Sequence, residues 1–199
     1  MKLEKLTAGA AVLAGPVYLG VGLTTALLTP GFDLSRHPLS LSTLGPLGAV
    51  QMANFWVTGL LVVVASLGWK RTAGWFLRLY GVALVLAGVF LPDPVAGFPP
   101  GAEGGFSWHG MLHFAVGGVG FLFLFLSTVA MGLRQFRSGK PGWAGFGWVT
   151  GVVFLAAFAW MAGSGGSPGG ILTFWLGLAL TFVWIATTGV SQVRASPVQ

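Results

Sequence analysis

Two histidines, His109 and His113, stand four positions apart at the start of an apolar stretch. Residues four apart share one face of a helix, and this spacing lets a helix present two imidazoles to a metal ion. His37 or Asp93 is available as a third ligand, and such a set with a bound water would suit a catalytic zinc. One interpretation is therefore a metal-dependent membrane hydrolase. Another is a haem protein whose axial histidines come from His37 and from the apolar stretch that begins at His109. A structural role is the alternative, because a histidine near a membrane surface can hydrogen-bond a loop carbonyl.

Arg36 and Asp93 also allow more than one role. Arg36 can form a loop ion pair with Asp33 or Asp93, or it can bind an anion such as a lipid phosphate. Asp93 lies between Pro92 and Pro94, where the backbone is restricted and a short carboxylate bonds nearby amides. That setting favours a turn over chemistry.

Gln51, Asn54 and Thr58 recur at positions i, i+3 and i+7, so a helix would place them along one face. In a membrane such a polar stripe must face protein or water. The spacing predicts hydrogen bonds between helices, or else part of the wall of a cavity.

The elements that position these residues are apolar. Of the 199 residues, 55% are hydrophobic and 7% are charged, whereas soluble domains carry about 25% charged residues; the mean hydropathy is +0.84. This small number of charged residues cannot cover a surface exposed to water. We therefore predict an integral membrane protein in contact with membrane lipids. The net charge of +6 is spread over short segments, without the basic patch that nucleic-acid binding would need. The absence of cysteine excludes thiolate chemistry.

Apolar runs of about 20 residues have the length that crosses a bilayer. They predict an all-α, polytopic six-helix transmembrane bundle that forms a single domain, 1–199. The runs cover residues 6–29, 46–68, 75–91, 109–133, 143–163 and 170–190.

Lysine and arginine predict the orientation, because cytoplasmic loops of membrane proteins carry an excess of both. Of the 10 such residues in the chain, only Arg36 falls on the predicted outer side. The others share the opposite side: Lys2, Lys5, Lys70, Arg71, Arg78, Arg134, Arg137, Lys140 and Arg194. This bias predicts both termini in the cytoplasm (N-in, C-in) and a multi-pass protein of the cell (cytoplasmic or inner) membrane.

Gly147 and Gly151 form a GxxxG pattern on the fifth run, which favours close helix contact. Packing within the chain and a homo-oligomer through these glycines are both compatible with it. A transporter is not indicated, because no charge lies near the predicted midplane and no matching pair of broken helices is present.

The predicted topology gathers the unusual polar residues on the outer face. We therefore expect an outward-facing polar pocket that binds a lipid headgroup or a small molecule. Its candidate residues are Asp33, Arg36, His37, Ser40, Gln51, Asn54, Asp93, His109 and His113. If this pocket holds a metal, the ligands would be His109 and His113 with His37 or Asp93.

These motifs together resemble the domain of unknown function family 998, a group of bacterial and archaeal membrane proteins of about this length. The resemblance covers about the first two thirds of the chain and rests on Arg36 to Ser40, Gln51 with Asn54, Asp93-Pro94, and Ser107-Trp108-His109-Gly110 with His113. It implies a six-span fold in a prokaryotic membrane, with the marked residues facing outward, and it implies no particular reaction.

A looser similarity is to the membrane hydrolase superfamily that includes alkaline ceramidases, in which Ser, Asp and three His hold zinc for the hydrolysis of lipid amides. Here Ser40, Asp93 and the three histidines supply those residue types. Those proteins usually have seven spans and carry their histidine pair on the last one, so this chain departs from them in order and in number.

Overall fold

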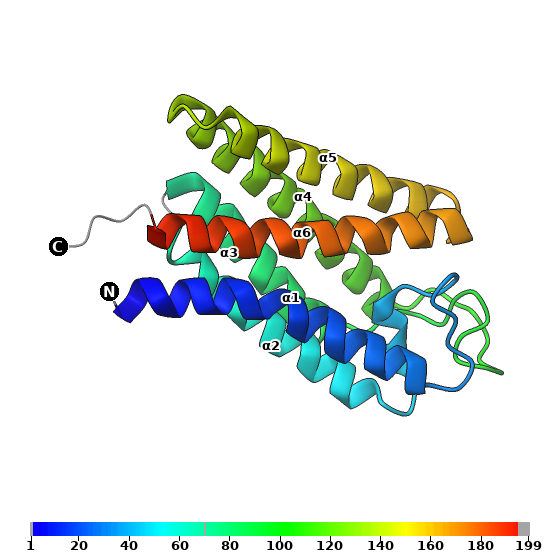
Figure 1. Cartoon of the computed structure of the whole chain (residues 1–199). Coiled ribbons are helices and arrows are strands. Elements are labelled where there is room, and N and C mark those ends of the chain that lie inside the picture. Colours follow the sequence, from blue (N-terminus) through cyan, green and yellow to red (C-terminus); the bar gives the residue numbers. More distant parts are fainter. Residues whose placement is uncertain (1, 70, 195–199) are drawn as a thin grey trace.

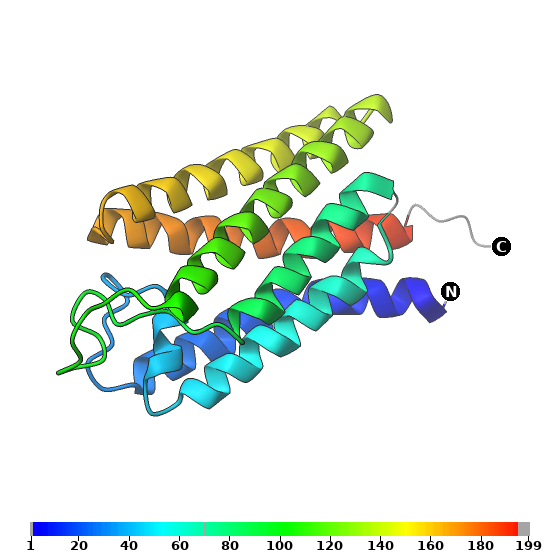
Figure 2. The same ribbon diagram turned by 180° about the vertical axis from the view of Figure 1, so that it is seen from behind.

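The computed structural model describes residues 2–69 and 71–194, which form an all-helical bundle (Figures 1 and 2). The predicted all-α fold class is confirmed. The elements are α1 (Lys2–Leu28), η1, a 3-10 helix (Leu39–Leu44), α2 (Gly48–Ser66), α3 (Arg71–Ala87), α4 (Trp108–Arg137), α5 (Pro141–Gly163) and α6 (Pro168–Arg194). Lys70 and the side chain of Arg194, two of the residues behind the predicted orientation, lie outside the described residues.

Five of the described helices are long and apolar enough to cross a membrane, namely α1, α2, α4, α5 and α6. The chain is therefore a multi-pass membrane protein. α3 is not among the five. It has 17 residues, which at 1.5 Å per residue span about 26 Å, against a hydrocarbon core of about 30 Å.

α3 is shifted by four residues from the predicted span 75–91: it begins at Arg71 and ends at Ala87. Its first residue is the charged Arg71, which a search for apolar runs leaves out. At the other end a turn follows Ala87, and Pro92 lacks the N–H that a continuing helix would need.

The helices form a closed ring. Each helix packs against the next one along the chain, and α6 packs against α1. We call the end of the ring at which α1 begins and α6 ends the terminal end. The opposite end, which holds η1 and the long segments 29–47 and 88–107, is the loop end (Figure 1).

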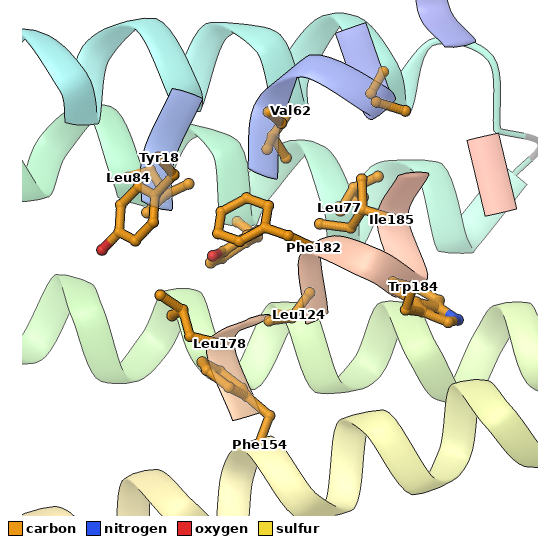
Figure 3. Packing of buried hydrophobic residues seen from close by; sticks show 14 of the residues in the cluster. Tyr18, Val62, Leu77, Leu84, Leu124, Phe154, Leu178, Phe182, Trp184 and Ile185 are labelled. Carbon is orange, nitrogen blue, oxygen red and sulfur yellow. The ribbon is translucent and has the colours of Figure 1, made fainter. Parts of the chain in front are cut away.

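Apolar side chains from all six α-helices pack against one another in the interior of the ring (Figure 3). Trp184 and Phe154 are among the largest fully buried side chains. The ring of Phe182 in α6 lies 5.2 Å from the ring of Tyr18 in α1. Gly15 permits this approach, because a Cβ there would lie only 2.8 Å from the Phe182 Cβ. Small residues thus bring α1 and α6 close enough to close the ring.

Gly147 and Gly151 face other helices of the same chain. A Cβ at Gly147 would lie 3.0 Å from the indole nitrogen of Trp184 in α6, and one at Gly151 would overlap Thr128 in α4. The GxxxG pattern therefore serves packing within the chain. A homo-oligomer through these glycines stays a prediction.

Candidate functional site

His37 joins the two long segments of the loop end. It is 3% exposed, and its ring lies 5.2 Å from that of Phe32 and 5.3 Å from that of Phe98. Nδ1 accepts the N–H of Asp33 at 2.9 Å, and Nε2 donates to the carbonyl of Ala96 at 3.2 Å. Backbone groups thus satisfy both ring nitrogens and hold the two segments together.

The two aspartates of the loop end accept hydrogen bonds from serines. Asp93 accepts the Ser107 hydroxyl at 2.5 Å and its N–H at 2.9 Å, and Ser107 caps α4 by accepting the N–H of Gly110 at 3.0 Å. Asp33 binds the hydroxyl and the N–H of Ser35 in the same way, at 2.7 and 2.8 Å. The side-chain hydrogen bond first, and then the backbone one, holds the pKa of each carboxyl below its ordinary value. Asp33 therefore braces a local turn, whereas Asp93 holds the start of α4 to the segment that follows α3.

His113 closes the end of α3. Its Nδ1 donates to the carbonyl of Phe90 at 2.7 Å and lies 3.2 Å from that of Ala87. Nδ1 therefore carries the proton, and Nε2 of the neutral ring is left as an acceptor. His113 is 8% exposed, whereas His109, one turn earlier, is exposed, and its ring centroid lies 3.7 Å from that of Trp108. The predicted pair has one member in the interior and one at the surface.

The residues predicted as metal ligands make separate contacts. Within residues 2–69 and 71–194, no group of three or more His, Cys, Asp or Glu that could hold a metal ion is found. His37 engages both ring nitrogens with the backbone, and His113 keeps only Nε2 for a ligand. Zinc binding, haem ligation and the hydrolase interpretation stay predictions.

The polar stripe of α2 ties this helix to α1. Asn54 Nδ2 donates to the carbonyl of Tyr18 at 3.0 Å, and Thr58 Oγ1 donates to Asn54 Oδ1 at 3.3 Å. Gln51 Oε1 accepts from Thr25 Oγ1 and from Asn54 Nδ2, both at 3.3 Å, while Gln51 Nε2 has no partner among the described residues. Two of these, from Asn54 to Tyr18 and from Thr25 to Gln51, are the hydrogen bonds between helices that the i, i+3, i+7 spacing predicts. A ligand-binding role for Gln51 and Asn54 stays a prediction.

The loop-end half of the bundle contains a cavity of about 260 Å³, lined by residues of all six α-helices and of the loop-end segments. Its wall is mostly apolar. Among the nine residues predicted as a site, the wall includes Arg36, Ser40, Asp93 and His113. The remaining five do not line it: Asp33, His37, Gln51, Asn54 and His109. The structure thus brings together part of the predicted set around a space that is less polar than expected.

Three polar aromatic residues of the wall were missed by the sequence interpretation, namely Tyr18, Tyr80 and Trp175. The Tyr80 hydroxyl and Trp175 Nε1 are buried and have no hydrogen-bond partner among the described residues. For the two tyrosines, the signal in the sequence was their position. The chain has only 2 tyrosines, and both lie inside apolar runs rather than at the membrane interface that this residue prefers.

Arg36 is an exposed residue of the cavity wall. Its charge is the smallest contribution to the lowered pKa of Asp33, after the hydrogen bonds from Ser35. Asp33 and Asp93 direct their carboxylates to serines, and in the described structure neither forms an ion pair with Arg36. The loop ion pair that the sequence allowed is therefore not formed.

Comparison with known proteins matches the chain to a family. No curated protein and no solved structure matches the chain. The model of the family described as "Protein of unknown function (DUF998)" matches residues 12–191. The match begins in α1 and ends in α6, so it also takes in α5 and α6, which the sequence motifs did not reach. Because it extends over far more than half of the sequence, this multi-pass membrane protein belongs to the DUF998 family.

Proposed function

We propose that this protein spans the membrane six times with both termini in the cytoplasm, and that its cavity binds an amphipathic ligand with an anionic headgroup. The ligand is a lipid or a small molecule with the same chemistry. The loop end then faces outward, and α3 crosses the membrane with the help of the turn that follows Ala87.

The order of polarity along the cavity supports an amphipathic ligand. The charged residues of the wall, Arg36 and Asp93, belong to the loop-end segments. Deeper in the bundle the wall is aromatic, and the ring of Phe121 lies 4.8 Å from that of Phe158 and 5.6 Å from that of Phe174. Ligand pockets are typically apolar with a few placed polar groups, and they measure about 300 to 1,000 Å³. A cavity of about 260 Å³ suits a small or slender molecule.

The observation that carries the proposal is the acceptor that His113 presents in this wall. His113 is 8% exposed and lines the cavity. Its Nδ1 donates to a backbone carbonyl, so Nε2 of the neutral ring is left as an acceptor. A bound molecule with a hydroxyl or amide donor would supply the partner for this nitrogen, and an unsatisfied buried polar group costs about 1 to 3 kcal/mol.

Arg36 supports an anionic headgroup. A guanidinium binds phosphate or carboxylate through two parallel hydrogen bonds, and the neighbouring carboxylates bond to serines instead of to Arg36. The proposed orientation is supported by the terminal end, where the described basic residues other than Arg36 gather, including Lys2, Lys5, Arg134 and Lys140.

Thermal unfolding of the purified protein in micelles tests the proposal. We expect phosphatidylglycerol to stabilise the wild type by about 2.7 kcal/mol when its concentration is 100 times Kd. Arg36→Ala should lose this stabilisation. Arg137→Ala is the matched control, because it removes the same charge from an exposed position at the terminal end.

Glycerol 3-phosphate, which has the headgroup chemistry without a tail, separates a soluble ligand from a lipid. Stabilisation by either compound that depends on Arg36 supports the proposal. No stabilisation by any anionic or zwitterionic phospholipid or by glycerol 3-phosphate, or an equal loss in both variants, would count against it.

A further inference from the structure

The wall of the cavity opens sideways between α4 and α5. Phe114, Gly117 and Gly118 of α4 and Phe158 and Ala162 of α5 line this part of it. Phe114 is 56% exposed, and Ala162 is exposed as well. A Cβ at Gly117 would meet no atom within 4 Å, and one at Gly118 would meet only Phe158, at 4.0 Å. α4 and α5 therefore make no contact at Gly117 and only a loose one, through the Phe158 ring, at Gly118. We call this gap the α4–α5 opening.

Nearer the terminal end the same two helices pack tightly. A Cβ at Gly132 of α4 would overlap Trp148, and one at Gly151 of α5 would overlap Thr128. Figures 1 and 2 both show the two ribbons side by side toward the terminal end and apart toward the loop end. The α4–α5 opening is the wide end of a wedge whose narrow end is held by close contacts.

The depth of the opening places it in hydrocarbon. Gly117 lies nine residues after Trp108, the first residue of α4, which is about 14 Å along the helix axis. That is about half of a hydrocarbon core of about 30 Å. The exposed side chains of α4 on either side of Gly117 are apolar, among them Met111 and Val119. The opening therefore joins the cavity to the acyl chains of the leaflet at the loop end, and not to water.

We infer that the occupant of the cavity is a membrane lipid whose acyl chain enters from this leaflet through the α4–α5 opening. This inference rests on the proposed function and names its ligand class. The tail lies against Phe121, Phe158 and Phe174, and the anionic headgroup stays at Arg36 on the loop end. A ligand that arrives from water would not need an opening at this depth.

A photoreactive lipid tests the route. The full-length protein is reconstituted in phosphatidylcholine vesicles that contain phosphatidylglycerol with a diazirine at the end of one acyl chain, and the cross-linked residues are mapped by mass spectrometry. In the wild type we expect cross-links to Tyr80 and Trp175 inside the cavity. Leu27, which is 72% exposed, serves as the internal standard for contact with bulk lipid.

We expect Gly117→Phe to block the opening, because a Cβ at this position meets no atom within 4 Å and the ring can extend into the gap. We expect the cavity cross-links to fall at least about fivefold relative to Leu27 in this variant. Gly20→Phe is the matched control. It lies on the exposed surface of α1, has no atom within 4 Å of its Cβ, and should keep the cavity cross-links of the wild type.

Two outcomes would overturn the inference and leave the proposed function standing. The first is equal cavity labelling in Gly117→Phe and Gly20→Phe. The second is an Arg36-dependent stabilisation by glycerol 3-phosphate that matches the stabilisation by the whole lipid, with no cavity labelling in the wild type. Absence of both labelling and Arg36-dependent stabilisation would overturn the two together.

Discussion

His113 has two roles: its Nδ1 donates a hydrogen bond to the backbone that follows α3, and the residue also lines the cavity. His113→Phe keeps an aromatic ring but removes the donor to the carbonyls of Ala87 and Phe90. A buried carbonyl that loses its partner costs about 1 to 3 kcal/mol. We expect the free energy of unfolding to fall by an amount in this range, measured by chemical unfolding in micelles.

His109→Phe is the control for this variant, because His109 is exposed and its ring lies against that of its neighbour Trp108. Exposed substitutions usually change stability by less than about 0.5 kcal/mol. Equal losses in the two variants would show that the contacts of His113 Nδ1 do not hold the end of α3.

Asp93 makes stability depend on pH. Hydrogen bonds from Ser107 hold its pKa in the folded protein below the ordinary value of 3.8. A carboxyl with a depressed pKa contributes stability that is fully present above its unfolded-state pKa and is lost as the pH falls through the folded-state pKa. The advantage of the wild type over Asp93→Asn should therefore be constant at higher pH and shrink below pH 3.8.

Melting temperatures of the two proteins between about pH 6 and about pH 2.5 check this. Asp33 titrates in the same acidic range, but it is present in both proteins and cancels in their difference. A difference in melting temperature that stays constant down to the lowest pH would contradict the role given to Asp93.

At the residue scale the sequence predicted which polar residues gather at one end, but not which of them face a common space. Charge and hydropathy place His37 and His113 near the membrane surface. Whether an imidazole meets a carbonyl or a cavity depends on the turns after Leu28 and Ala87, and periodicity does not encode these turns. Tyr80 was missed because a search for metal ligands and charges passes over a hydroxyl inside an apolar run.

Helix packing at the narrow end of the wedge depends on Gly151. A larger side chain there would overlap Thr128 of α4, and overpacking of this kind costs about 1 to 3 kcal/mol. We expect Gly151→Leu to lower the melting temperature and to reduce the yield of folded protein. Thermal unfolding measures this directly.

Gly145→Leu on the same helix is the matched control, because no atom lies within 4 Å of its Cβ. We expect it to melt at or above the temperature of the wild type, since glycine is a poor helix former. Sedimentation of both variants measures their oligomeric state and so tests the alternative, a homo-oligomer through Gly147 and Gly151. If Gly151→Leu melts like the wild type and only dissociates an oligomer, the glycine pair is an interface between chains.

The helices themselves could be predicted from the sequence because a membrane imposes a length and an apolar composition on each span. The exceptions occur where other forces act. α3 is displaced from the predicted run because Arg71 extends a helix beyond its apolar part. η1 has no counterpart in the prediction, since Leu39–Leu44 shows neither the length nor the period of a span.

At the scale of the whole molecule, the predicted orientation can be tested with single cysteines, because the natural chain has none. Ala102 is exposed at the loop end, and Ser138 is exposed at the terminal end. A membrane-impermeant maleimide applied to intact cells should label Ala102→Cys and leave Ser138→Cys unlabelled until the membrane is opened. Labelling of Ser138→Cys alone in intact cells would show the opposite orientation to the predicted one.

Because the helices form a closed ring, their order along the chain can be changed without changing their arrangement in space. Every helix has two principal neighbours, and α6 meets α1 much as any helix meets the next. A linker from the end of α6 to the start of α1, combined with a new break in the turn between α4 and α5, would give a circular permutant. Both junctions lie at the terminal end, so each helix would keep its neighbours and its direction in the bundle. The fold thus depends on the contacts between pairs of neighbouring helices, and we expect the circular permutant to adopt the same fold.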